Sequence, residues 1–200
     1  MVKKLVYGVG IVGTKYLTKI NYKHLKEYDA WTNMLKRCFS EKFKSQRPTY
    51  KDTTCCNEWL LYENFYEWLH SQENFDKWLN GNFALDKDII VKGNKVYSPE
   101  TCCLAPQSVN KLFTKRDAIR GDLLIGISKQ KDKFVTKCCN PITGKRDFLG
   151  VYDTQEEAFN TYKKYKEKII KQIAQEEYGK GNITKECYNA MINYEVEITD

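Results

Sequence analysis

Hydrophobic and polar residues alternate along residues 126–151, and this alternation gives way to a helical period over residues 158–173. Alternation places successive side chains on opposite faces of a strand. Turn-forming residues divide the alternating stretch, so three short strands are predicted at residues 126–130, 133–139 and 145–151. The pattern predicts an antiparallel sheet that buries one face and exposes the other.

The two faces of this predicted sheet differ in polarity. The face expected to be exposed is polar and basic and carries one aromatic residue; its members are Ser128, Gln130, Lys133, Lys137, Arg146 and Phe148. The opposite face carries Phe134, Cys138 and Leu149, and we expect it to be buried. The exposed face is broad enough to meet one large partner.

A long helix is predicted to cover the buried face. Thr154 and Glu157 fit a capping box, which begins a helix by satisfying its first backbone N–H groups. Apolar positions then follow at helical spacing, namely Ala158, Tyr162, Tyr165, Ile169 and Ile173. A further short helix is predicted at residues 184–193, and the acidic end after it is expected to be solvated.

The first half of the chain has a different pattern. A helix is predicted at residues 28–39, with an apolar face formed by Trp31, Met34, Leu35 and Cys38. A second helical region, residues 57–79, is rich in aromatic residues that are expected to form a core: Trp59, Phe65, Trp68, Phe75 and Trp78. A strand, a Gly-Asn turn, a second strand and a short helix are predicted from Leu85 to Asn110. The fold class is therefore α+β.

The distribution of charged residues indicates what kind of partner the chain binds. The chain of 200 residues has a formal net charge of +7, and residues 111–146 hold ten Lys or Arg against three Asp or Glu. A basic segment over a sheet face favours a polyanion, because phosphate contacts release counterions. A solvated lysine-rich surface is the alternative. No apolar run is long enough for a membrane span, and residues 1–13 do not form a secretory leader, so a cytoplasmic protein without a membrane partner is expected.

Short motifs in the sheet and helix carry a family resemblance. They are Gly126-Ile-Ser, Lys133-Phe134, Arg146-Asp-Phe-Leu-Gly150 and the segment from Tyr152 to Ala158. Together they resemble the plant ethylene-response-factor (Apetala-type) DNA-binding domain. The resemblance implies that the sheet lies in the major groove of double-stranded DNA, with Ser128, Gln130, Lys137, Arg146 and Phe148 in contact and with Lys133 and Lys145 beside them. Ser128 and Gln130 replace the family's first-strand arginines.

The first half resembles a second family. Its motifs are Trp31-x-x-Met-x-x-Arg-Cys38, Cys56-x-x-Trp59, Leu85-Asp-Lys-Asp, Tyr97-Ser-Pro-Glu-Thr-Cys102 and Asn110. They resemble phage His-Asn-His (HNH) homing endonucleases, whose catalytic unit is a ββα-metal finger. The resemblance implies a hydrolase that cuts DNA with one divalent ion, Mg²⁺ or Mn²⁺.

The residues that this chemistry needs are partly replaced. By position, Asp86 corresponds to the metal-binding Asp, Lys87 to the general base, Thr101 to the second metal ligand and Asn110 to the last motif position. Lysine acts as a base only when its pKa is depressed, and the neighbouring carboxylates favour the opposite shift. The sequence predicts a finger with weak or lost activity, and an active nuclease with a non-standard site stays open.

The cysteines allow two interpretations. Cys38, Cys56 and Cys102 stand where the resembling group also has cysteines, and Cys55 and Cys103 adjoin two of them. Three thiolates that converge with a fourth ligand would bind structural Zn²⁺. No CxxC pair is present, so buried, reduced cysteines are the alternative.

These observations divide the chain into four predicted parts. They are an HNH-like module at residues 1–110, a basic linker at 111–122, an Apetala-type domain at 123–178 and a C-terminal extension at 179–200. The leading hypothesis is a phage-type DNA-binding protein derived from a homing endonuclease. An active nicking endonuclease and a host-takeover factor that binds a host protein are the alternatives.

Overall fold

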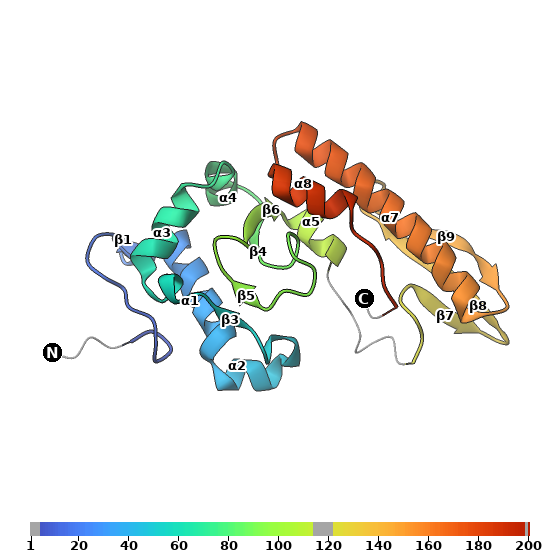
Figure 1. Ribbon diagram of the computed structural model, residues 1–200, viewed down its shortest axis with the longest axis horizontal. Coiled ribbons are helices and arrows are strands. Elements are labelled where there is room, and N and C mark those ends of the chain that lie inside the picture. Colours follow the sequence, from blue (N-terminus) through green and yellow to red (C-terminus); the bar gives the residue numbers. More distant parts are fainter. Residues whose placement is uncertain (1–4, 114–121, 199) are drawn as a thin grey trace. The chain divides into compact units, whose positions relative to one another are not determined.

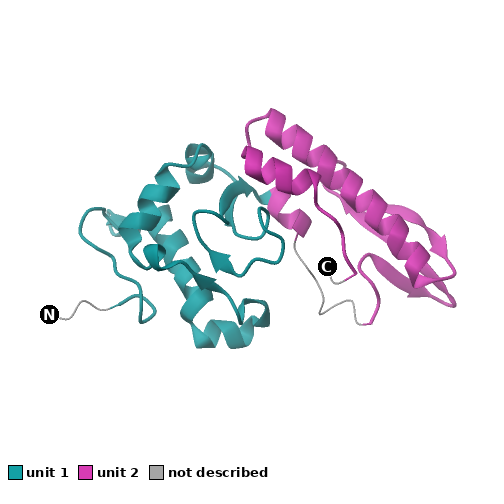
Figure 2. Cartoon of the chain, viewed as in Figure 1, with its two compact units in different colours: residues 1–107 teal, residues 108–200 magenta. Residues whose placement is uncertain are grey.

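The computed structural model describes residues 5–113, 122–198 and 200. The chain forms two compact units, residues 1–107 and residues 108–200 (Figure 2). Both contain helices and small sheets, which confirms the predicted α+β class (Figure 1). Most of the predicted linker, including Lys115, Arg116 and Arg120, lies outside the described residues.

The first unit consists of short elements. Its helices are α1 (Lys26–Phe39), α2 (Glu41–Gln46), α3 (Tyr62–His70) and α4 (Phe75–Asn80), with 3-10 turns η1 (Pro48–Tyr50) and η2 (Asn57–Leu60). Its strands are β1 (Lys19–Ile20), β2 (Lys23–His24), β3 (Thr54–Cys55), β4 (Phe83–Asp86), β5 (Val96–Tyr97) and β6 (Cys103–Pro106).

Aromatic side chains form the core of the first unit, as predicted. Trp31, Trp59 and Phe65 are buried, and the Trp31 indole N–H donates to the carbonyl oxygen of Trp59 at 2.7 Å. This bond satisfies a buried donor that would otherwise weaken the core. Trp68 and Phe75 are half-buried at the margin of the same cluster. The helix predicted at 28–39 is α1, which begins two residues earlier.

The strand pairing after Leu85 differs from the prediction. The Gly-Asn turn forms, with Asn94 N–H donating to Val91 O, but the strands on either side of it do not pair with each other. Strand β4 pairs antiparallel with β6, and β5 pairs parallel with β3. The Asn94 side chain donates to the carbonyls of Lys87 and Val96, at 2.8 and 2.7 Å. Such side-chain bonds occupy backbone groups that a hairpin ladder would need.

The second unit contains the sheet and its covering helix. Short α5 (Gln107–Asn110), which begins at the last residue of the first unit, and η3 (Lys111–Phe113) precede the antiparallel strands β7 (Ile127–Gln130), β8 (Lys133–Asn140) and β9 (Lys145–Tyr152). Helices α7 (Gln155–Gly179) and α8 (Lys185–Ile192) follow. Helix α7 packs on one face of this sheet, as predicted. No helix among the described residues has the length and apolar character of a membrane span.

Local sequence explains how α7 begins and how it is fixed to the sheet. The Thr154 hydroxyl accepts the Glu157 N–H, and the Glu157 carboxylate accepts the Thr154 N–H, so the predicted capping box is confirmed. Farther along α7, the Tyr165 hydroxyl donates to the Asp147 carboxylate of β9. Asn140 of β8 donates to the same carboxylate at 2.9 Å. These polar contacts fix the direction of the helix over the strands.

The C-terminal segment is only partly as predicted. Helix α8 forms, with Thr184 as its N-cap and Met191 fully buried. The end after it is not simply solvated, because Val196 is buried in the sheet–helix core and its N–H donates to Glu167 of α7 at 2.9 Å. The acidic composition of this end obscured the two apolar residues, Tyr194 and Val196, that pack there.

Candidate nucleic-acid interface

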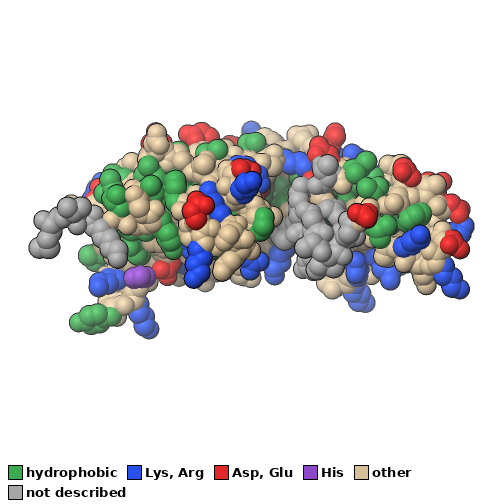
Figure 3. Space-filling view, turned by 90° about the horizontal axis from the view of Figure 1, so that it is seen from below, with side chains coloured by type: hydrophobic (Ala, Val, Ile, Leu, Met, Phe, Trp, Pro, Cys, Tyr) green, Lys and Arg blue, Asp and Glu red, His purple; other side chains and the backbone are tan. Residues whose placement is uncertain are grey.

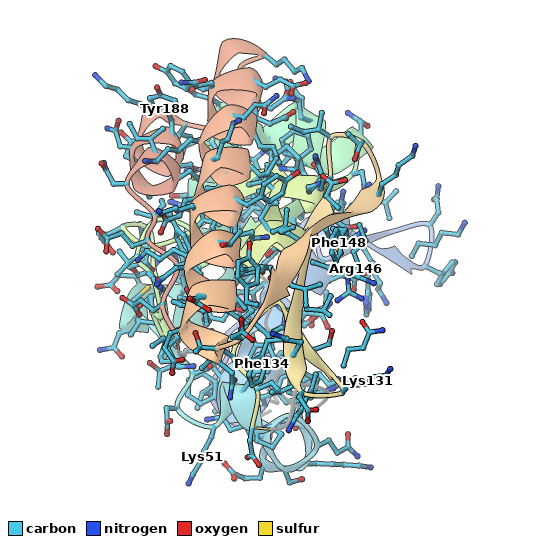
Figure 4. The ribbon with its side chains drawn as sticks, turned by 90° about the vertical axis from the view of Figure 1, so that its right-hand side faces the viewer. Lys51, Lys131, Phe134, Arg146, Phe148 and Tyr188 are labelled. Atoms are coloured by element: carbon cyan, nitrogen blue, oxygen red, sulfur yellow. The ribbon has the colours of Figure 1, made fainter. Side chains whose placement is uncertain are left out.

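The outer face of the three-stranded sheet is defined by its strand register. Ser128 pairs with Val135, Lys137 pairs with Phe148, and Cys139 pairs with Arg146. Residues paired across antiparallel strands point to the same side of a sheet. In Figure 4, Arg146 and Phe148 lie on the side away from α7. The register therefore brings strands β7, β8 and β9 together in one surface, which we call the outer face.

A bulge in β9 shapes the outer face. Thr136 pairs with Gly150 and Lys137 pairs with Phe148, so Leu149 has no partner on β8. Leu149 packs into the core beside α7, while Phe148 stays outside with 61 % of its surface exposed. Gly150, which follows the extra residue and pairs with Thr136, has φ +144°, a conformation that favours glycine. The bulge keeps Arg146 and Phe148 on the exposed side.

The structure brings most of the predicted contact residues together. Those on the outer face are Ser128, Gln130, Lys133, Lys137, Arg146 and Phe148. Lys145 differs from them, because it pairs with Asn140 on the helix side of the sheet, where it remains exposed at the strand end. Lys145 can reach a partner only from this end.

Two apolar residues of the outer face were missed from the sequence. Val135 and Val151 pair with each other on the same side as Ser128. Simple alternation from Phe148 places Val151 inside, but the bulge returns it to the outside, where it is exposed. Val151 therefore adds exposed apolar area to the outer face, whereas Val135 is buried.

The unpaired charges of the outer face are positive. Lys133 forms an ion pair with Asp153, whereas Lys137 and Arg146 have no acidic partner within the described residues. Asp147 is turned to the helix side, where hydrogen bonds from Tyr165 and Asn140 hold the pKa of its carboxyl below the ordinary value. No described acidic residue of β7, β8 or β9 therefore neutralises the outer face.

The finger-like region of the first unit has a different character. The buried Lys87 ammonium donates to Asp88 at 2.6 Å and to the Asn94 carbonyl at 2.7 Å. The Asp86 carboxylate accepts the backbone N–H groups of Asp88 and Ile89, at 2.7 and 2.9 Å, and burial raises the pKa of this carboxyl. Both side chains thus hold the loop after β4 in place.

The other predicted finger residues do not complete a metal site. Thr101 donates its hydroxyl to the Val96 carbonyl at 2.7 Å. Asn110 belongs to the second unit. The chain's two histidines, His24 and His70, were not predicted to be ligands, and they contact Asp29 and Glu27. Within the described parts of the chain, no three His, Cys, Asp or Glu side chains are grouped as metal ligands. The described residues show no preformed group of ligands for a divalent ion, and Mg²⁺ or Mn²⁺ stays a prediction.

The predicted zinc cysteines lie in the aromatic core. Cys38 is buried beside Cys55, and this contact together with burial raises the pKa of the Cys55 thiol. Burial raises the pKa of Cys56 to about 11 and that of Cys102 to about 12. Burial therefore favours neutral thiols, whereas zinc needs thiolates. Structural Zn²⁺ stays a prediction.

Comparison with known proteins does not indicate a function for this site. Comparisons of the chain with protein-family models, with curated proteins and with solved structures found no match.

Proposed function

We propose that this chain is a double-stranded DNA-binding protein that contacts DNA with the outer face of β7, β8 and β9. The observation that carries the proposal is the combination on one surface of Lys137, Arg146 and the exposed Phe148, with no acidic residue among them. A phosphate backbone is the natural ligand of such a surface, because each neutralised phosphate releases counterions.

The residue types of the outer face suit distinct parts of duplex DNA. Lys137 provides a point charge for a phosphate, which sets affinity and register but reads no sequence. The Arg146 guanidinium can bind the two acceptors of a guanine edge in the major groove, and Gln130 can bind an adenine edge. Phe148 can contact a thymine methyl group. Affinity then comes mainly from charge, and sequence preference comes from Arg146 and Gln130.

Duplex binding by paired variants tests this assignment. Fluorescence anisotropy with a labelled duplex should give a dissociation constant at least about tenfold higher for Lys137→Ala/Arg146→Ala than for the wild type. The matched control is Lys168→Ala/Lys171→Ala, which removes the same charge from exposed positions of α7. Equal losses in both variants would assign the binding to general charge rather than to the outer face.

A metal-dependent homing or nicking endonuclease is the second candidate. The antiparallel pair of β4 and β6, followed at once by α5, has the order of a ββα finger, and Asp86 ends the first of these strands. We propose that the finger no longer cleaves, because Lys87 is engaged in two hydrogen bonds and is not available as a base. Plasmid incubated with Mg²⁺ or Mn²⁺ should stay intact. Cleavage that Asp86→Asn abolishes would establish the nuclease instead.

A host-protein partner is the third candidate. It gains support only if the wild-type protein fails to bind any nucleic acid at low salt. In that outcome the outer face would be a protein-docking surface.

A further inference from the structure

A small β-hairpin in the first unit carries an aromatic residue at its tip. Strands β1 and β2 pair antiparallel, with Ile20 opposite Lys23, and the two-residue turn between them is Asn21-Tyr22. The Tyr22 side chain contacts almost nothing, because 97 % of its surface is exposed. Figure 3 shows a projection that carries hydrophobic side chains at its end and Lys, Arg and His side chains beside them. A fully exposed aromatic ring is unusual in a chain whose other aromatic residues are mostly buried or half-buried.

The base of this hairpin is firmly attached to the helices below it. The Glu63 carboxylate accepts the Thr14 N–H at 2.7 Å, and Tyr16 stacks on Tyr66 with ring centroids 4.0 Å apart. On the other side, the His24 ring meets the Tyr28 ring edge-on at 5.0 Å. Since both ends are held, the exposed tip is a defined part of the surface rather than a loose loop.

The backbone of the tip is conformationally costly. Asn21 and Tyr22 have φ values of +48° and +63°, which are the left-handed values of a tight hairpin turn. Asparagine tolerates this region, but a bulky aromatic residue rarely occupies it, and glycine would be the ordinary choice. Strain of this kind is concentrated at functional positions. The positive φ of Tyr22 is therefore a reason to look for a function at this position.

The charge around the tip indicates the kind of partner. The first 26 residues contain six lysines and no Asp or Glu. Lys23 adjoins the turn, Lys19 lies one pair farther along on the opposite face of the hairpin, and neither has an acidic partner within the described residues. Lys15 and Lys26, by contrast, are occupied by Glu67 and by the Trp78 carbonyl. Two unneutralised cations near an exposed ring suit a single nucleic-acid strand, which offers phosphates to the cations and bases to the ring.

We propose that Tyr22 stacks on an unpaired base of a nucleic-acid strand while Lys19 and Lys23 contact the flanking phosphates. An unpaired base offers its ring face without unstacking, whereas insertion between paired bases must first open a base step. The hairpin therefore favours single-stranded or locally opened DNA over intact duplex. This inference deepens the proposed DNA-binding function by adding a second contact surface, and it can be tested without the outer face.

The direct test uses a single-stranded oligonucleotide that contains 2-aminopurine, whose fluorescence is quenched by stacking. The wild type should bind it and quench it. Tyr22→Ala should bind about fivefold more weakly or worse, which is the lower end of the loss expected for one base–aromatic stack. Tyr22→Trp should retain quenching. Lys19→Ala/Lys23→Ala should weaken binding and flatten its salt dependence, because two phosphate contacts are lost.

Two controls separate loss of stacking from loss of folding and from failure of the proposed function. Tyr22→Gly keeps the turn, so it should lose quenching while its thermal midpoint is equal to or above that of the wild type. Tyr178→Ala removes another exposed tyrosine, on α7, and should bind and quench normally. Absence of single-strand binding by the wild type, or unchanged binding by Tyr22→Ala, overturns the inference. The same protein assayed on intact duplex with Lys137→Ala/Arg146→Ala reports on the outer face separately.

Discussion

Gly126 precedes β7, and its carbonyl oxygen accepts hydrogen bonds from the Lys137 N–H and the Thr136 hydroxyl of β8. The loss of stability caused by Gly126→Ala can be worked out from the structure. The Gly126 φ of +77° is in the left-handed region, where an alanine costs about 1–2 kcal/mol. An added Cβ would lie 2.7 Å from Cγ of Tyr162 and closer still to two other ring carbons. Tyr162 is buried in the sheet–helix core and cannot move freely, so overpacking adds about 1–3 kcal/mol. Gly126→Ala should therefore destabilise the second unit by about 2–5 kcal/mol.

Gly144→Ala is the matched control for this prediction. Gly144 also has a positive φ, +68°, but nothing lies within 4 Å of its added Cβ, so only the conformational cost of about 1–2 kcal/mol applies. Urea unfolding followed by far-UV circular dichroism measures both variants. All four tryptophans belong to the first unit, so their fluorescence monitors that unit independently. Equal destabilisation by the two substitutions would refute the packing of Gly126 against Tyr162.

Three further predictions follow from individual contacts. Thr154→Ala removes the cap of α7 and should cost about 1 kcal/mol in urea unfolding, while Thr154→Ser should cost little. The pKa of Asp147 is depressed in the folded state, so its stabilising contribution is complete above the ordinary Asp pKa of about 4 and is lost as pH falls below it; Asp147→Asn should flatten stability against pH in that window. Lys87→Met removes hydrogen bonds to Asp88 and to the Asn94 carbonyl, so it should lower the free energy of unfolding of the first unit by about 2 kcal/mol. Urea unfolding followed by tryptophan fluorescence measures this loss, and duplex binding should be unchanged.

The spacing of hydrophobic residues predicts the sheet and the helix of the second unit well. In a strand every second side chain points to the same face, so the alternation of hydrophobic and polar residues fixes which side chains share a face. Phe134 and Cys138 face α7 and Lys137 faces outward, as alternation requires. The prediction fails at Val151, because the bulge at Gly150 inserts one residue without changing the local composition. A glycine within a strand is the only trace of this bulge in the sequence.

Long-range pairing could not be predicted from local pattern in the first unit. The Gly-Asn turn before β5 forms, but β5 pairs with β3, which lies about forty residues earlier. The β1–β2 hairpin was also missed, because Asn21-Tyr22 lacks the glycine that usually marks such a turn. The exposure of Tyr22, the positive φ values and the unpaired lysines of this tip depend on the three-dimensional structure, and no local sequence pattern indicates them.

The salt dependence of duplex binding tests the role of the outer face most directly. For the wild type, the logarithm of the binding constant should fall linearly with the logarithm of salt concentration. Because Lys137 is assigned to a phosphate and Arg146 to a base edge, Lys137→Ala/Arg146→Ala should make the slope shallower by about one, and Lys168→Ala/Lys171→Ala should leave it unchanged. A slope and affinity equal to those of the wild type in the Lys137→Ala/Arg146→Ala protein would contradict DNA binding by the outer face.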